Sequence, residues 1–178
     1  SYAITGTDSA LFDIVTSSGV VTFKVVPDYE NPSDNGANNI YDIIVTVTDD
    51  GAGPLSTTEA VTITVSDVNE SPVITEGTST AVTMDEDASP TAFSLTLNAT
   101  DSENDTLTWS IDTQGTNGTA SVSGTGSSKA ISYSPDANYA GSDSFVVQVG
   151  DGVTTVDTIS VNVTVNKQND VHTGTVTI

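Results

Sequence analysis

One stretch decides the fold: Ala60-Val61-Thr62-Ile63-Thr64-Val65-Ser66-Asp67-Val68-Asn69-Glu70-Ser71-Pro72. Apolar residues alternate through residues 60–66, which is the pattern of a half-buried β-strand. The four residues that follow carry three oxygen-bearing side chains, and Pro72 favours an extended backbone at Ser71. Flexible linkers are instead rich in glycine and serine. This segment is therefore predicted to be a short, stiff, acidic joint between two blocks of strands.

The charge of the chain limits its partners. Its 178 residues include 24 acidic side chains, three lysines and no arginine, for a formal net charge of -21. Such a chain repels nucleic acid phosphates and anionic lipid, so neither is an expected partner. No apolar run approaches the ~20 residues that span a bilayer, so no membrane insertion is predicted. The chain has no cysteine for disulfides, and bound cations are a plausible substitute that would offset repulsion between its carboxylates.

The remaining sequence predicts an all-β class, because runs of Thr, Val, Ser, Ile and Tyr alternate between turn residues. We expect two tandem Ig-like Greek-key β-sandwiches, in domains 1–70 and 71–168, with 169–178 as a linker and the first strand of a further repeat. Asn117-Gly118 predicts a two-residue hairpin turn. The expected strands lie near 1–5, 20–26, 40–48, 59–66, 80–84, 91–98, 106–112, 119–123, 129–134, 144–149 and 155–165.

Two groups of motifs resemble cadherin repeats. The first half is similar to a bacterial cadherin repeat, through Phe12, 19–23, Pro27-Asp28-Tyr29-Glu30, 41–49 and the joint at 67–72. The second half is similar to the cadherin-like repeats of very large bacterial surface adhesins. Its matching residues are Asp85-Glu86-Asp87, 99–105, 133–136, 141–145 and Gly150-Asp151-Gly152. The first domain begins late in this pattern, so we expect its leading strand and early acidic motif to be missing.

This resemblance implies calcium ions between successive repeats. Calcium takes about six to eight oxygen ligands, and shared carboxylates let several ions form one cluster. The joint is one residue shorter before its proline than in vertebrate cadherins, so the ion count could be two rather than three. The implied ligands come from the first domain, the joint and the second domain: Asp28, Glu30, Asp67, Asn69, Glu70, Asp101, Glu103, Asp105 and Asp151.

Other acidic residues and the aromatic residues leave alternatives open. Asp85-Glu86-Asp87 either serves the same joint or faces water. Trp109 is expected in the core rather than on a sugar-binding surface. The only histidine, His172, has no cysteine partner for a zinc site and is a poor candidate for a catalytic base.

The expected function is a non-enzymatic, calcium-rigidified structural or adhesive segment of a long bacterial cell-surface or filamentous protein, located outside the cell. Its partners would be neighbouring repeats of the same protein. The alternative is a calcium-dependent carbohydrate- or protein-binding module, which requires a cleft or an exposed cluster among Trp109, Tyr133, Tyr139 and Phe145. Copies could also join head to tail, if the strand at 171–178 inserted into the first domain of the next copy. Arbitrary cutting from a longer polypeptide would leave the same loose ends.

Overall fold

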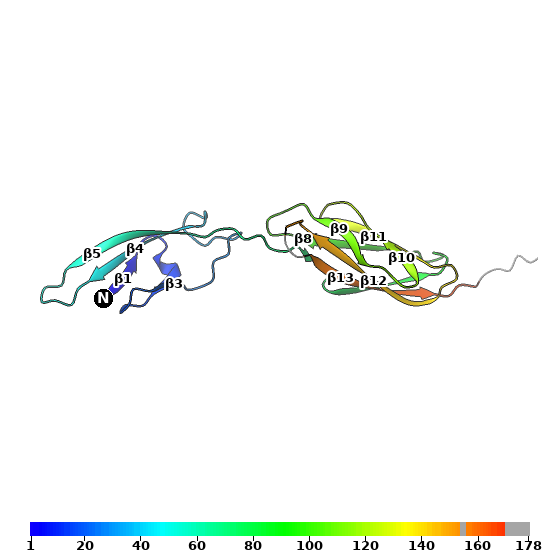
Figure 1. Cartoon of the computed structure of the whole chain (residues 1–178), viewed down its shortest axis with the longest axis horizontal. Coiled ribbons are helices and arrows are strands. Elements are labelled where there is room, and N and C mark those ends of the chain that lie inside the picture. Colours follow the sequence, from blue (N-terminus) through cyan, green and yellow to red (C-terminus); the bar gives the residue numbers. More distant parts are fainter. Residues whose placement is uncertain (154–155, 170–178) are drawn as a thin grey trace, which may run out of the picture. The chain divides into compact units, whose positions relative to one another are not determined.

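The computed structural model describes residues 1–153 and 156–169. The chain divides into two compact units, unit 1 (Ser1–Val68) and unit 2, which begins at Asn69 (Figure 1). Both units are built of β-strands, which confirms the predicted all-β class. Within the described residues the one helical element is the short 3-10 turn η1 (Ser9–Leu11), and no helix is long and apolar enough to cross a membrane. The domain boundaries expected from the sequence stay predictions.

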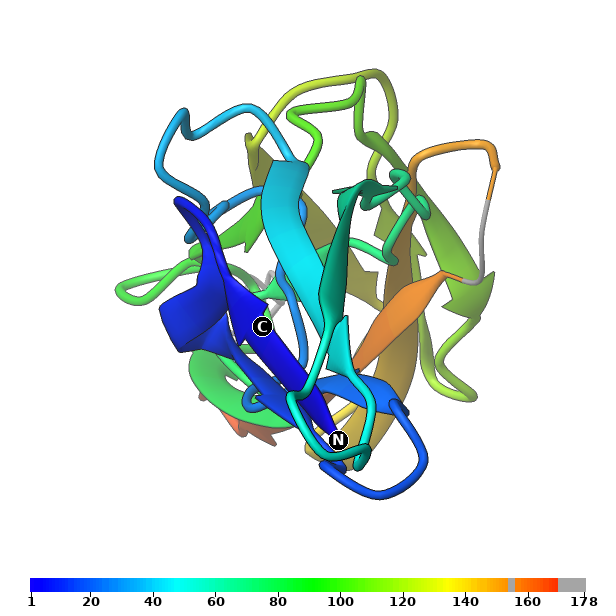
Figure 2. The ribbon, with the colours of Figure 1, turned by 90° about the vertical axis from the view of Figure 1, so that its left-hand side faces the viewer.

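Unit 1 contains one three-stranded sheet and one two-stranded sheet. The sheet order β1-β4-β5 places β4 in the centre, and β2 pairs with β3 (Figure 2). Phe12, Tyr41 and Ile43 form the buried core, with the Tyr41 ring edge-on to Phe12 at a centroid distance of 6.0 Å. The strands are β1 (Tyr2–Thr5), β2 (Phe12–Ile14), β3 (Val21–Phe23), β4 (Ile40–Thr48) and β5 (Ser56–Thr64).

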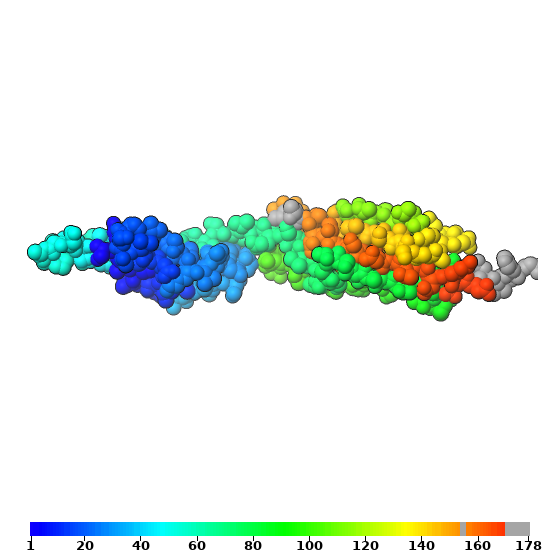
Figure 3. Space-filling view, turned by 90° about the horizontal axis from the view of Figure 1, so that it is seen from below, coloured from blue at the N-terminus to red at the C-terminus, as the bar shows by residue number. Residues whose placement is uncertain are grey.

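Unit 2 is a sandwich of two four-stranded sheets, ordered β10-β11-β8-β6 and β7-β13-β12-β9. All of its strand pairs are antiparallel except β7 with β13, which run parallel. In the space-filling view the orange-red atoms of β13 adjoin green atoms of the same unit (Figure 3). The strands are β6 (Val73–Ile74), β7 (Ser79–Asp85), β8 (Leu95–Thr100), β9 (Thr108–Thr113), β10 (Gly118–Ser121), β11 (Ser128–Pro135), β12 (Gly141–Gly150) and β13 (Asp157–Asn166).

The core of unit 2 lies between its two sheets. Trp109 on β9 is only 1% exposed, as expected, and its Nε1–H donates to the carbonyl of Gly126 at 2.7 Å. Tyr133 and Phe145 stack with ring centroids 5.5 Å apart. Alternate residues of β12 and β13 are buried, which is the period-two pattern that the sequence predicted for these strands.

Several sequence expectations were wrong in detail. Asn117-Gly118 is not a hairpin turn: neither residue has a positive φ, and β10 pairs with β11 rather than with β9. The strand expected at 91–98 begins only at Leu95, because the backbone of Thr91 bonds to Asp85 instead of to a neighbouring strand. The short strands β2 and β6 were not predicted, and the strand at 171–178 and His172 lie outside the described residues.

Candidate metal centre

The residues expected to bind calcium are divided between the two units. Unit 1 holds Asp28, Glu30 and Asp67, all of which are exposed. In the loop that follows β3, Asp28 Oδ1 accepts the backbone N–H groups of Glu30 and Asn31, each at 3.1 Å. This carboxylate therefore fixes the turn that carries Glu30, and the second carboxylate oxygen of Asp28 is not used by these bonds. Participation of these three residues in a metal site stays a prediction.

Within unit 2, a tight turn after β8 brings Asp101 and Asp105 together. Asp101 Oδ1 accepts the backbone N–H of Asp105 at 2.9 Å, and the Asp101 carbonyl accepts the N–H of Asn104 at 3.3 Å. Asn104 has φ +60°, a left-handed conformation that asparagine tolerates better than most residues. The turn thus presents two carboxylates from positions four residues apart.

The start of unit 2 is bonded to the turn between β12 and β13. Asn69 Nδ2 donates to Asp151 Oδ2 at 2.6 Å and to the Glu70 carbonyl at 2.9 Å. Asp151 Oδ1 accepts the backbone N–H of Val153 at 2.8 Å. Two of the expected ligands, 82 positions apart in the sequence, are therefore direct neighbours.

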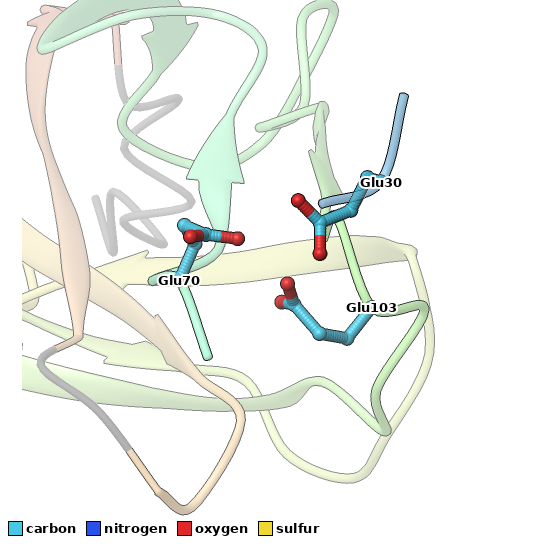
Figure 4. Close-up of side chains that lie close together, drawn as sticks. All are labelled: Glu30, Glu70 and Glu103. Atoms are coloured by element: carbon cyan, nitrogen blue, oxygen red, sulfur yellow. The ribbon is translucent and has the colours of Figure 1, made fainter. Parts of the chain in front are cut away.

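Glu70 and Glu103 also lie close together in unit 2. A carboxylate oxygen of Glu70 lies within 4.8 Å of a carboxylate oxygen of Glu103. Figure 4 labels both side chains, together with Glu30 of unit 1. Both Glu103 oxygens and Asp101 Oδ2 are shielded from solvent and have no hydrogen-bond partner among the described residues. Buried carboxylates without partners are costly, and like charges at this distance repel. Calcium, a hard cation that prefers carboxylate oxygens, fits these residues.

Sequence reasoning missed a second class of carboxylates, which tie loops together inside each unit. In unit 2 the buried Asp143 accepts hydrogen bonds from the Tyr133 hydroxyl at 2.7 Å and from the backbone N–H groups of Thr116, Asn117 and Ser144 at 2.9–3.0 Å. Burial disfavours the charge of Asp143, but these donors outweigh burial and hold its pKa below the ordinary value. Burial and the bond to Asp143 raise the pKa of Tyr133.

Unit 1 contains a similar carboxylate in the loop between β3 and β4. Asp34 accepts the backbone N–H groups of Gly36, Asn38 and Asn39 at 2.9–3.1 Å. Burial opposes ionisation of Asp34, yet these donors keep its pKa below the ordinary value. An Asp-Asn-Gly sequence is a common turn signal, so the turn was readable from the sequence, but the burial of its carboxylate was not.

Neither expected role, serving the joint at 67–72 or facing water, holds for all three residues of Asp85-Glu86-Asp87. Asp85 is buried and accepts from Asn166 Nδ2 at 3.2 Å and from the Thr91 N–H at 3.0 Å, while Glu86 accepts the N–H of Gln168 at 2.7 Å. These bonds place Asp85 and Glu86 beside the end of β13, because β7 runs parallel to β13. The hydrogen bond from Asn166 is the largest of the interactions that lower the pKa of Asp85 below its ordinary value.

The aromatic cluster expected for a carbohydrate-binding module is not exposed. Trp109, Tyr133 and Phe145 are at most 6% exposed, and the partly buried Tyr139 packs against the same core. A sugar ring stacks only on an accessible aromatic face. The aromatic form of the carbohydrate-binding alternative is therefore contradicted.

Comparison with known proteins identifies a family and several structures with a similar fold. Residues 69–164 match a family model described as a bacterial Ig domain. The chain is similar to Drosophila N-cadherin EC1-4, with 25% identity and a TM-score of 0.56 over 94% of this chain and 41% of that one. It is also similar to domains 1-4 of protocadherin gamma B7, with 21% identity and a TM-score of 0.54 over 96% of this chain and 42% of that one.

A third similar structure is human CDH23 EC21-23, with 20% identity and a TM-score of 0.50 over 92% of this chain and 61% of that one. The chain thus spans less than two thirds of each of these cadherin segments. No curated protein sequence matches it. The likenesses establish the cadherin-like, Ig-type fold that the sequence motifs predicted.

Proposed function

This chain belongs to the bacterial Ig domain family, and we propose that it is a calcium-rigidified structural and adhesive segment of a long bacterial protein outside the cell. Its role is mechanical rather than catalytic, and its partners are neighbouring repeats of the same polypeptide. Calcium bound at the joint around Asp67 and Asn69 limits bending between repeats. The carboxylates assigned to this site are Asp28, Glu30, Asp67, Glu70, Asp101, Glu103, Asp105 and Asp151, with Asn69 as a neutral ligand.

One observation carries the proposal. Both carboxylate oxygens of Glu103 and one of Asp101 are shielded from solvent and have no hydrogen-bond partner among the described residues. The carboxylate of Glu70, which carries the same charge, lies beside Glu103. Elsewhere in unit 2 a buried carboxylate such as Asp143 has a full set of donors. The contrast supports a cation as the missing partner of Glu103 and Asp101.

The effect of calcium on stability follows from its expected affinity. Extracellular calcium modules have dissociation constants of about 10⁻⁴–10⁻³ M, so about 10 mM calcium stabilises the folded state by about 1.4–2.7 kcal/mol per site. For a unit of this size we expect the melting temperature to rise by about 6 °C or more. Differential scanning calorimetry in calcium and in EDTA measures this shift. Equal melting temperatures in the two buffers would refute the proposal.

A matched pair of variants assigns the effect to the candidate site. Glu103→Gln removes a shielded carboxylate, and we expect the calcium-dependent rise in melting temperature to shrink by at least half. Asp112→Asn removes the same charge from an exposed position on β9, where the carboxylate accepts a hydrogen bond from the neighbouring Thr113 hydroxyl. This control should keep the full response to calcium. An equal response in both variants would mean that calcium acts through general charge screening.

A further inference from the structure

The chain contains two Asn-Gly pairs, Asn35-Gly36 in unit 1 and Asn117-Gly118 in unit 2. Such a pair can react with itself: the glycine backbone nitrogen attacks the side-chain amide carbon of the asparagine and displaces ammonia. Glycine is the most permissive residue at the second position, because it has no Cβ to restrict the backbone. The reaction requires an accessible side-chain amide and a base that removes the proton of the glycine nitrogen.

The Asn35-Gly36 pair meets the first requirement. It lies in the loop between β3 and β4, and both residues are exposed. Among the described residues, Asn35 is bonded only through its backbone N–H, which donates to Asp8 Oδ1 at 2.8 Å. No hydrogen bond within the described part of the chain holds its side-chain amide, which is therefore free to turn toward the nitrogen of Gly36.

A carboxylate contacts the proton that this reaction removes. The Gly36 N–H donates to Asp34 Oδ2 at 2.9 Å, which is within the reach required of a general base. An amide nitrogen is a weak nucleophile until it loses its proton, so a base at this position activates it. The loop thus holds a nucleophile and its base beside an accessible electrophile.

The Asn117-Gly118 pair has a fixed backbone instead. The Asn117 N–H donates to Asp143 Oδ2 at 3.0 Å, and the Asn117 carbonyl accepts the N–H of Asp136 at 2.9 Å. Gly118 begins β10, where it is paired with Pro135 of β11. Within the described part of the chain, no carboxylate accepts the N–H of Gly118. This pair serves as an internal reference with the same chemistry and a different setting.

We propose that Asn35-Gly36 is a site of autocatalytic deamidation in the folded protein. The Gly36 nitrogen forms a bond to Cγ of Asn35, and its proton passes to Asp34. The bond from Cγ to the side-chain nitrogen then breaks, and that nitrogen takes up the proton and leaves as ammonia. Water opens the resulting five-membered ring to aspartate or isoaspartate at position 35. No oxidant or reductant takes part.

The modification weakens the loop that Asp34 holds together. The ring nitrogen carries no hydrogen, so the hydrogen bond from Gly36 to Asp34 is lost when the ring forms. Isoaspartate also lengthens the main chain between positions 35 and 36. Both final products add a carboxylate to a residue whose backbone is bonded to Asp8, and like charges repel. The stability of unit 1 should therefore decline with the age of the protein.

Peptide mapping by mass spectrometry, after incubation of the full chain at neutral pH, tests the proposal. In the folded chain, Asn35 should deamidate at least about tenfold faster than Asn117. In urea, where both pairs lose their folded surroundings, the two rates should become similar. Calorimetry of the aged chain should show a lower melting temperature for unit 1 and an unchanged one for unit 2. Equal rates in the folded chain, or a faster reaction at Asn117, would overturn the proposal.

Two variants test the role of Asp34. Asp34→Asn retains a side-chain oxygen near the Gly36 N–H but removes the base, so the rate at Asn35 should fall at least about tenfold. Asp13→Asn removes the same charge from an exposed position on β2 and should leave the rate unchanged. Calorimetry checks that unit 1 remains folded in both variants, and the comparison of the two Asn-Gly pairs in the native chain needs neither. An unchanged or faster rate in Asp34→Asn, or an equal fall in Asp13→Asn, would contradict the assignment of Asp34 as the base.

Discussion

Replacing Asp143 with alanine should strongly destabilise unit 2. The substitution removes the acceptor for four donors: the Tyr133 hydroxyl and the backbone N–H groups of Thr116, Asn117 and Ser144. Thr116 and Ser144 are exposed, so water can replace the acceptor there. The Tyr133 hydroxyl and the half-buried Asn117 N–H have less access to water. Leaving each of these two donors unpaired costs about 1–3 kcal/mol, so the free energy of unfolding should fall by about 2–6 kcal/mol.

Urea unfolding followed by tryptophan fluorescence measures this change, because Trp109 is the single tryptophan and lies in the core of unit 2. Tyr133→Phe removes one donor and leaves Asp143 with three, so it should cost only about 1–2 kcal/mol. In the double variant the two effects should not add, since each removes the same bond. Asp112→Asn is the exposed control, with an expected change below about 0.5 kcal/mol. A loss for Asp143→Ala no larger than the loss for this control would refute the reasoning.

The contribution of Asp143 should also depend on pH. Its pKa in the folded state lies below the ordinary value of 3.8, so the folded state binds the proton less tightly than the unfolded state does. The stabilisation is therefore complete above the unfolded pKa and disappears as the pH falls through the folded pKa. The difference in unfolding free energy between the native chain and Asp143→Asn should be constant near neutral pH and should shrink below about pH 4. A difference that stayed constant down to pH 2 would contradict this assignment.

Three further substitutions give distinct results. Asp34→Ala leaves three backbone N–H groups of its loop without their acceptor, so it should lower the melting temperature of unit 1. The melting temperature of unit 2 should not change, and calorimetry that resolves the two transitions measures both. Trp109→Phe removes the donor to the Gly126 carbonyl and should destabilise unit 2 by about 1–3 kcal/mol in urea titrations followed by circular dichroism. Gly118→Ala would place a Cβ against the Tyr133 hydroxyl oxygen and should cost about 1–3 kcal/mol in the same assay. An unchanged midpoint would show that β10 shifts to make room for the methyl group.

The strands were predictable where one face is buried and the other is exposed to solvent. Residues 40–48 were expected as a strand and form β4 with the same bounds; exposed and more buried side chains alternate from Ile40 to Val45, and β-branched residues continue the strand beyond that point. Prediction failed where side chains take over backbone groups. Asp143 holds the N–H of Asn117, which prevents the expected Asn-Gly hairpin, and Asp85 holds Thr91 outside β8. Such bonds from side chains to backbone groups leave no periodic signal in the sequence.

The same limit applies to the acidic residues. Composition and motif spacing could assign Asp101, Glu103 and Asp105 to one turn, and the structure gives that turn its geometry. They could not separate carboxylates that lack donors, such as Glu103, from carboxylates that are fully occupied, such as Asp143. Sorting them requires knowledge of which backbone N–H groups lie nearby, which only the folded chain supplies.

The parallel pairing of β7 with β13 has a consequence when the chain is pulled. β7 lies near the start of unit 2 and β13 near its end, so tension along the polypeptide draws these two neighbours in opposite directions along their length. Their ladder, seven residue pairs from Ser79 to Asp85, is then loaded in shear, and its bonds share the force instead of unzipping one at a time. The two-residue pairing of β6 with β8 is much shorter and should yield first. Under load, unit 2 should therefore extend slightly when the β6–β8 pairing breaks and then resist further unfolding through the β7–β13 ladder.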